Sequence, residues 1–364
     1  MKKLAFIKFG GLASGGTEIN FQNIAKQLSL NYKVDYFYCD AAPYIGSDWK
    51  HPDTDSFRKN FLENSKVNLI KFHVGFKDIT NRHHKWINSD FWDKFNEESY
   101  DLIFASGSGH PEYPFTKILK KPIFNYVNLN AGVNNQKNII KTICNSSFTA
   151  KEWLSQGGDG NRLEIIPVCR ESFQYSDDSL VGELNLNNKF VYGLHQRNDD
   201  EIYSQVPLKA FKKISNAKNF FLMLGGSRKY SIQAKKLNIR NFIQLPHSAD
   251  NEVINKFLNT LNVYTHGRKY GETFGLAITE AMSYGLPVIS HKAESNAHVD
   301  VVGDCGKVFE KWNTYSYSKE MYKLENDKKY YLEKSNCSKQ KFLSEFSENA
   351  ILKLWSNLVK DFFD

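Results

Sequence analysis

Cysteine is scarce in this chain of 364 residues, and its pattern excludes several classes of protein. There are five cysteines and no C-x-x-C pair: Cys39, Cys144, Cys169, Cys305 and Cys337. Scattered and odd in number, they predict neither a disulfide framework nor a zinc site, and they favour a reducing compartment. Apolar runs are also short, and none reaches the ~20 residues that a membrane-spanning helix needs. The apolar stretch Leu4–Ile7 is shorter than the ~7–15 residues of a signal peptide's core, so we expect a first β-strand there.

Composition and charge are those of an ordinary globular protein. Charged residues make up 24% of the chain and hydrophobic residues 41%, and the length favours two domains. The net charge is +8, but the lysines look dispersed and accompany no motif that reads nucleic acid. We therefore expect no nucleic-acid partner, whereas the charge leaves a peripheral contact with anionic lipids open.

The most informative stretch is HGRKYGETFGLAITEAMSYGLPVIS, residues 266–290. It predicts a strand end, a glycine-bearing loop, a short helix and a second strand. A helix that begins near Gly275 would present unpaired amides and the positive end of its dipole to an anion such as a diphosphate. Glu272 and Glu280, with seven residues between them, would flank that anion and accept hydrogen bonds from sugar hydroxyls. The ligand indicated is a nucleotide joined through phosphates to a sugar.

This stretch resembles the E-x7-E signature of retaining glycosyltransferases of family 4, which have the GT-B fold. The matching residues are Glu272, Phe274-Gly275-Leu276, Glu280-Ala281-Met282 and Gly285-Leu286-Pro287-Val288. The resemblance implies that Glu280 binds the ribose hydroxyls and that Glu272 contacts the donor sugar. It also implies that the Gly275-Leu276 amides bind the diphosphate, within a donor-binding loop that includes Phe274.

The N-terminal half alternates expected strands with loops and helices. Strands are expected at residues 4–9, 33–38, 68–72, 101–105, 122–127, 141–145 and 163–168. The glycine-rich turn after the first strand lacks the G-x-G-x-x-G fingerprint, so NAD binding is only weakly indicated. By resemblance, Gly15 and Gly16 face the donor cleft. His110 follows a strand end and is the acceptor-side candidate.

No metal ligand set stands out. Asp53-Thr54-Asp55 spells D-x-D, but it lies in a loop without nucleotide-binding context, and we expect a turn there. Because no ligand cluster in the sequence requires a metal, we expect a reaction that needs no metal and no cofactor beyond the nucleoside diphosphate sugar itself.

The C-terminal half repeats the alternation. Residues 170–189 are polar and aperiodic, as expected of a linker. Strands are then expected at 189–194, 220–224, 241–245, 261–265 and 286–290, with helices at Val206–Ile214 and Asn251–Leu258. We therefore predict an α/β protein of the GT-B class with two Rossmann-like domains facing a cleft: residues 1–170 on the acceptor side and 171–346 on the donor side. Residues 347–364 are expected to form a helix that crosses back to the first domain.

Positive charge for the diphosphate is expected near the end of the first strand of the second domain. By resemblance Arg197 takes this role, because its planar guanidinium suits phosphate oxygens. The lysine that the family usually places shortly afterwards is missing, and Arg268 or Lys269 is the substitute we consider. Gly225, after the next strand, is expected beside the nucleotide.

Taken together, the sequence predicts a metal-independent retaining glycosyltransferase of the hexosyltransferase type. It would move a sugar from a nucleoside diphosphate sugar to an acceptor hydroxyl on a glycan or lipid-linked glycan. Glu272 and Arg197 are the expected catalytic residues. We expect a cytoplasmic protein, with contact to the membrane surface as a further expectation. The alternatives are a nucleotide-sugar epimerase of the same fold and a catalytically inactive GT-B scaffold protein.

Overall fold

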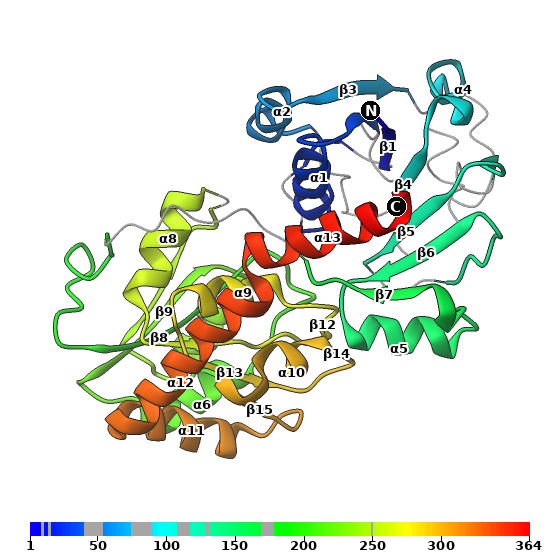
Figure 1. Cartoon of the computed structure of the whole chain (residues 1–364). Helices are drawn as coiled ribbons and strands as arrows, with labels where there is room; N and C mark the ends of the chain where they lie inside the picture. The colour runs from blue at the N-terminus through cyan, green and yellow to red at the C-terminus, as the bar shows by residue number, and fades with distance from the viewer. Residues whose placement is uncertain are drawn as a thin grey trace. The chain divides into compact units, whose positions relative to one another are not determined.

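The computed structural model describes residues 1–8, 11–13, 16–39, 54–73, 89–107, 117–128, 132–168, 178–248 and 250–364. The chain forms two compact units (Figure 1). The first comprises Met1–Glu171 together with Ile351–Asp364, and the second comprises Ser172–Ala350. No helix in these ranges is long and apolar enough to cross a membrane.

The first unit is built on a seven-stranded parallel sheet in the order β3-β2-β1-β4-β5-β6-β7. Its strands are β1 (Lys3–Lys8), β2 (Lys33–Cys39), β3 (Val67–Phe72), β4 (Leu102–Gly107), β5 (Ile123–Val127), β6 (Ile139–Cys144) and β7 (Leu163–Ile165). Its helices before the linker are α1 (Gly16–Leu28), α2 (Ser56–Glu63), α4 (Phe91–Lys94) and α5 (Ser147–Ser155), with 3-10 turns η1 (Glu97–Ser99) and η3 (Gly160–Arg162).

Helix starts in this unit follow their capping residues. Asp55, part of the D-x-D sequence, accepts hydrogen bonds from the Phe57 and Arg58 amides and caps α2. Ser146 accepts a hydrogen bond from the Thr149 amide and caps α5. The side chain of Asp55 therefore has a structural partner.

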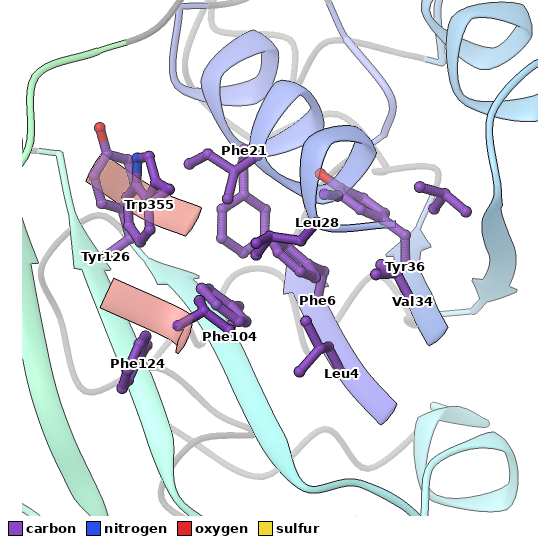
Figure 2. Packing of buried hydrophobic residues seen from close by; sticks show 14 of the residues in the cluster. Leu4, Phe6, Phe21, Leu28, Val34, Tyr36, Phe104, Phe124, Tyr126 and Trp355 are labelled. Carbon is purple, nitrogen blue, oxygen red and sulfur yellow. The ribbon is translucent and has the colours of Figure 1, made fainter. Parts of the chain in front are cut away.

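The last helix, α13 (Glu348–Phe363), packs into the core of the first unit. Trp355 is fully buried, and its ring lies 5.6 Å from that of Tyr126 and 6.1 Å from that of Phe104. Figure 2 shows Trp355 beside Tyr126, with Phe104, Phe6 and Phe21 continuing the same apolar cluster. The helical stripe at the end of the chain thus completes the first unit, as expected.

The second unit repeats the pattern with a six-stranded parallel sheet in the order β10-β9-β8-β11-β13-β15. These strands are β8 (Phe190–Gln196), β9 (Asn219–Gly225), β10 (Phe242–Leu245), β11 (Val263–Thr265), β13 (Val288–His291) and β15 (Gly306–Phe309). A separate parallel pair joins β12 (Gly271–Glu272) to β14 (Ser295–Asn296).

The helices of the second unit connect these strands. They are α6 (Val206–Ile214), α7 (Lys229–Lys236), α8 (Asn251–Thr260), α9 (Leu276–Ser283), α10 (Ala297–Val302), α11 (Thr314–Asn326) and α12 (Lys328–Lys341). A 3-10 turn η4 (Gly303–Cys305) precedes β15, and a π-helical turn η5 (Phe342–Phe346) precedes α13. Both sheets have the same relative strand order, so the predicted architecture of two Rossmann-like domains with a returning C-terminal helix is confirmed.

The expectation from cysteine was wrong in one respect. Cys305 and Cys337 form a disulfide that joins the turn before β15 to α12, with their Cα atoms 5.0 Å apart. The two residues are separated by 32 positions, so no local pattern in the sequence signals the pairing. Because disulfides persist mainly in oxidising compartments, the cysteines no longer favour a reducing one.

Candidate active site

The candidate site lies at the carboxyl edge of the second sheet, where β8 and β11 are neighbours. Strand order reverses between these two strands, since β9 and β10 extend the sheet to one side and β13 and β15 to the other. In open α/β sheets, ligands bind outside the carboxyl ends of the strands at such a reversal. The chain that follows β8 carries Arg197, and the chain that follows β11 leads to Glu272.

Helix α9 begins where the sequence predicted, with Gly275 as its N-cap. Gly275 has φ 111° and ψ 55°, a left-handed conformation that favours glycine, and a Cβ there would lie 3.2 Å from Ile278 Cδ1. The Ile278 and Thr279 amides both donate to the Gly275 carbonyl, so the amides of Leu276 and Ala277 are those at the open end of the helix. This end can receive an anion.

Glu272 is held by two basic side chains. Arg268 Nη1 donates to Glu272 Oε2 at 2.6 Å, and His266 Nε2 lies 3.3 Å from Glu272 Oε1. His266 is itself fixed by Ser290, whose hydroxyl oxygen lies 2.7 Å from Nδ1. Burial alone raises the pKa of Glu272, but Arg268 and His266 outweigh this effect and hold that pKa at about 2. The carboxylate is therefore ionised at neutral pH.

Glu280 contacts β8, one of the two strands between which the strand order reverses. It is buried in α9, and its Oε2 atom lies 2.7 Å from Nε2 of His195, the last residue but one of β8. No role was predicted for His195 from the sequence. Because 85 positions separate the two residues, only the fold reveals that His195 fixes the Glu280 carboxylate.

An open cavity of about 510 Å³ lies at the carboxyl ends of β8, β9 and β10. It is lined by Asn198, Asp200, Gly225, Gly226, Ser227, Arg228, Ser231, Gln244, Leu245, Pro246 and His247. Gly225 was predicted to lie near the donor, and a Cβ there would come within 2.3 Å of the Gln196 carbonyl. Gln244 Nε2 donates to the Gly225 and Gly226 carbonyls at 2.8 and 3.2 Å and shapes one wall.

Hydrogen bonds join the cavity to the loop that carries Gly267 and Arg268. Gln196 Nε2 donates to the Gly267 carbonyl at 2.6 Å, and the Gln196 carbonyl accepts from the Gly226 amide at 2.8 Å. The buried Tyr230 hydroxyl, 3.2 Å from Gln196 Oε1, supports the same junction. The cavity loop and the Arg268–Glu272 loop are thus parts of one site within the second unit.

Arg197 is at this edge, but it is partly exposed and already has a partner. Its Nε and Nη2 atoms donate to Asp199 Oδ2 at 3.0 and 2.8 Å. Burial raises the pKa of Asp199, but the Glu201 amide and Arg197 lower it to a greater extent. Lys269, the other cation considered, is half-buried, and its Nζ atom lies 3.8 Å from Glu201 Oε2. Arg268 is the more buried of the two, and its Nε atom has no hydrogen-bond partner among the described residues.

The remaining predicted site residues are not shown to line the cavity or the open end of α9. Phe274 is buried and packs against Phe346, with ring centroids 5.9 Å apart, so its side chain contacts protein. Gly16 is the exposed first residue of α1. Gly15 and His110 lie outside the described residues. In the ranges that are described, no group of three or more His, Cys, Asp or Glu side chains is arranged to hold a metal ion.

Three features of the site were not predicted from the sequence. The pair β12–β14 anchors Glu272, since Glu272 is in register with Asn296 and a Cβ on Gly271 would overlap the Ser295 carbonyl. His298 lies under the turn, because a Cβ on Gly275 would be 3.6 Å from His298 Cβ. Burial lowers the pKa of both His298 and His291 to about 4, so both are neutral at pH 7. A glycine, a strand partner and neutral histidines together fix the start of α9.

Known proteins can now be compared with this fold. The family described as "Glycosyl transferases group 1" matches residues 186–341, which include the cavity, Glu272 and Glu280. No curated protein sequence matches the chain.

Solved structures match over almost the whole chain. Anabaena HepE, in complex with UDP and glucose, has 17% identity and a TM-score of 0.72, covering 99% of this chain and 100% of its own. A glycosyltransferase from Rickettsia africae has 12% identity and a TM-score of 0.73, covering 100% and 99%. Sucrose-phosphate synthase from Thermosynechococcus elongatus has 16% identity and a TM-score of 0.69, also covering 100% and 99%. At these identities the likeness shows the fold, which is GT-B.

Proposed function

We propose that this protein is a retaining glycosyltransferase that transfers a sugar from a nucleoside diphosphate sugar to an acceptor hydroxyl, without a metal ion. The observation that carries the proposal is the open end of α9 between two fixed carboxylates, Glu272 and Glu280, where the strand order reverses. An anion-binding helix end flanked by two hydroxyl acceptors suits a diphosphate with a sugar at each side.

The cavity beside β8, β9 and β10 gives the nucleoside a place in this scheme. Its wall is formed by glycine loops and polar side chains, and it adjoins Arg197 and Gln196 in the chain. With the base in the cavity, the ribose would reach Glu280 and the diphosphate would reach the amides of Leu276 and Ala277. The match of residues 186–341 to glycosyl transferases group 1 supports this assignment.

The charges fit the departure of a nucleoside diphosphate. Negative charge grows on the leaving phosphate oxygen in the transition state, where helix amides and guanidinium groups stabilise it. Arg197 stands at the edge, and the partly buried Arg268 guanidinium adds positive charge beside Glu272. In this proposal Arg268 supplies part of the charge of the missing lysine.

The pKa of Glu272 limits what this residue does. A carboxylate whose pKa is about 2 is a weak base and is not a proton donor at neutral pH. It is therefore proposed to accept hydrogen bonds from hydroxyls of the donor sugar and to position the sugar. The acceptor proton then goes to the leaving phosphate oxygen.

A donor panel tests the activity. UDP-glucose is the first donor to try, because HepE has been solved with UDP and glucose. Purified protein is incubated in EDTA with UDP-, GDP- and ADP-sugars, with and without a panel of alkyl glycosides as acceptors. We expect acceptor-dependent release of one nucleoside diphosphate and a product whose anomeric configuration, read by NMR, equals that of the donor. Glu272→Gln should lower kcat by about a hundredfold.

Other outcomes would contradict the proposal in distinct ways. Conversion of the donor sugar into an epimer without an acceptor would identify an epimerase. Nucleotide binding with no turnover on any donor would identify a scaffold protein. Inversion at the anomeric carbon would overturn the retaining mechanism alone.

A further inference from the structure

Positive charge is concentrated in one segment of the second unit. Residues 202–248 contain nine lysines and arginines and no aspartate or glutamate: Lys209, Lys212, Lys213, Lys218, Arg228, Lys229, Lys235, Lys236 and Arg240. All nine are exposed. The nine positive charges of this segment alone exceed the net charge of +8 of the whole chain. The lysines are therefore less dispersed than we expected.

The fold gathers most of these cations at one place. Lys212 and Lys213 are in the last turn of α6, and Lys235 and Lys236 are in the last turn of α7. Lys218 directly precedes β9, and Arg240 lies two residues before β10. Since β8, β9 and β10 are parallel, helix ends and strand starts meet at the amino edge of the sheet, opposite the candidate active site.

Hydrogen bonds between these loops show that they are neighbours. Lys212 Nζ donates to the Asn238 carbonyl at 3.3 Å, which joins α6 to the loop after α7. Ser215 donates to Asn241 at 2.8 Å, and Lys189, which precedes β8, donates to the Ala217 carbonyl. The cations near the starts of β8, β9 and β10 therefore form one surface. We call it the basic edge: Lys189, Lys212, Lys213, Lys218, Lys235, Lys236 and Arg240.

The junction of α11 and α12 adds to the basic edge. Glu325 binds Asn219 Nδ2 at 3.0 Å and the Tyr192 hydroxyl at 2.9 Å, which brings this junction to the starts of β8 and β9. The exposed cations there are Lys323, Lys328 and Lys329. Of the acids nearby, Glu325 is engaged in these bonds, Asp327 caps α12, and Glu183 lies exposed in the turns before β8. The surface thus has a large excess of positive charge.

An apolar side chain stands among these lysines. Ile232 on α7 is 51% exposed, and at helical spacing Lys229, Lys235 and Lys236 surround it. An exposed isoleucine gains nothing against a nucleic-acid backbone, whereas it inserts readily into the headgroup region of a bilayer. Leu332 on α12, 47% exposed, adds a second apolar side chain next to the α11–α12 junction.

From the charge and the exposed isoleucine, we propose that the basic edge docks the second unit on a membrane surface rich in anionic phospholipid. Lysines and arginines near such a surface each contribute roughly fivefold to the partition constant. The attraction falls with ionic strength, because exposed charges are screened. This inference goes beyond the proposed sugar transfer, and lipid binding is measured without any donor or acceptor.

Vesicle co-sedimentation tests the inference with the full chain. Vesicles of phosphatidylcholine alone are compared with vesicles of phosphatidylcholine and phosphatidylglycerol, at low and high salt. We expect binding to the anionic vesicles only, weakened by salt. The variant Lys212→Gln, Lys213→Gln, Lys235→Gln and Lys236→Gln should bind on the order of a hundredfold more weakly. The control variant changes four exposed lysines of the first unit, Lys137→Gln, Lys151→Gln, Lys353→Gln and Lys360→Gln, and should lose much less.

A single neutral substitution separates lipid from other polyanions. Ile232→Ser should lower vesicle binding severalfold while leaving any binding to a DNA oligonucleotide unchanged. The proposal is overturned if the wild type does not bind anionic vesicles, or if both lysine variants lose vesicle binding equally. It is also overturned if the basic-edge variant loses only oligonucleotide binding. Circular dichroism and melting of each variant exclude unfolding as the cause.

Discussion

Glu272 and Glu280 are both acidic, but their neighbours give them different properties. Glu272 touches a guanidinium and an imidazole, whereas the buried Glu280 contacts the imidazole of His195. The first arrangement fixes a permanent negative charge close to the start of α9. The second fixes the direction of a carboxylate through a side chain from another strand. Each arrangement leads to a separate test.

The Glu272 network should make stability depend on pH in the acid range. The folded-state pKa of about 2 lies below the ordinary value of 4.5. The unfolded chain therefore binds the proton first, so this contribution is present above pH ~4.5 and is lost as pH falls toward 2. Its size is up to about 3 kcal/mol. Urea unfolding between pH 5 and pH ~2.5 should show a smaller loss of stability for Glu272→Gln than for the wild type.

The control for that experiment is Glu294→Gln, at an exposed carboxylate in the same unit. Its pH dependence should equal that of the wild type. If Glu272→Gln and the wild type lose stability in parallel on acidification, Glu272 is not held in its charged form by Arg268.

His195 is expected to position Glu280 and not to react. His195→Ala removes the partner at 2.7 Å and should raise the dissociation constant for the donor by roughly tenfold, with a smaller effect on kcat. His195→Gln keeps a hydrogen-bond donor and should restore part of the affinity. His73→Ala, in the first unit, serves as the control. Equal KM values for the wild type and His195→Ala would show that His195 does not position Glu280 for donor binding.

Among the elements, the start of α9 depends most on a single residue. Gly275→Ala places a Cβ at φ 111° and 3.2 Å from Ile278 Cδ1. We expect a loss of about 1–3 kcal/mol in unfolding free energy and weaker nucleotide binding. Gly182→Ala is the matched control, since a Cβ there meets nothing within 4 Å. The melting temperatures of both variants are measured by calorimetry, with and without nucleotide, and compared. Equal melting temperatures would show that the turn is not constrained.

Some elements could be predicted from the sequence and others could not. Helix α6 matches its predicted bounds, Val206–Ile214, because apolar residues recur at helical spacing. The edge strand β15 was missed, since Gly306 and Lys307 leave only Val308 and Phe309 as an apolar signal. Helix α12 was missed as well, because Ser338 is its only buried residue and it has no apolar face.

The site divides in the same way. The Glu272–Glu280 spacing and the start of α9 are local and could be read from the sequence. The partners His195, Ser290 and Asn296 come from other strands, and they become neighbours of these glutamates only when the sheet forms. Long-range pairing of this kind leaves no periodic signal in a single sequence.

At the scale of the whole molecule, the chain uses its last helix to complete its first unit. Trp355→Ala should cost about 3–5 kcal/mol, because it opens a cavity beside Tyr126 and Phe104. Leu354→Ala, at a neighbouring residue that is 45% exposed, should cost less than about 1 kcal/mol. Since the proposed donor site lies within the second unit, nucleotide affinity should survive Trp355→Ala at temperatures where the protein stays folded. A similar loss of stability in both variants would contradict the packing of α13.

The central claim is that the second unit binds a nucleoside diphosphate at the start of α9 without metal. The most direct measurement is titration calorimetry of UDP, GDP, ADP and CMP in EDTA, with the wild type, Glu280→Ala and the exposed control Glu294→Ala. The account predicts that one nucleoside diphosphate binds the wild type and the control equally, and binds Glu280→Ala at least tenfold more weakly. Binding that needs a divalent cation, or that is equal in all three proteins, would contradict it.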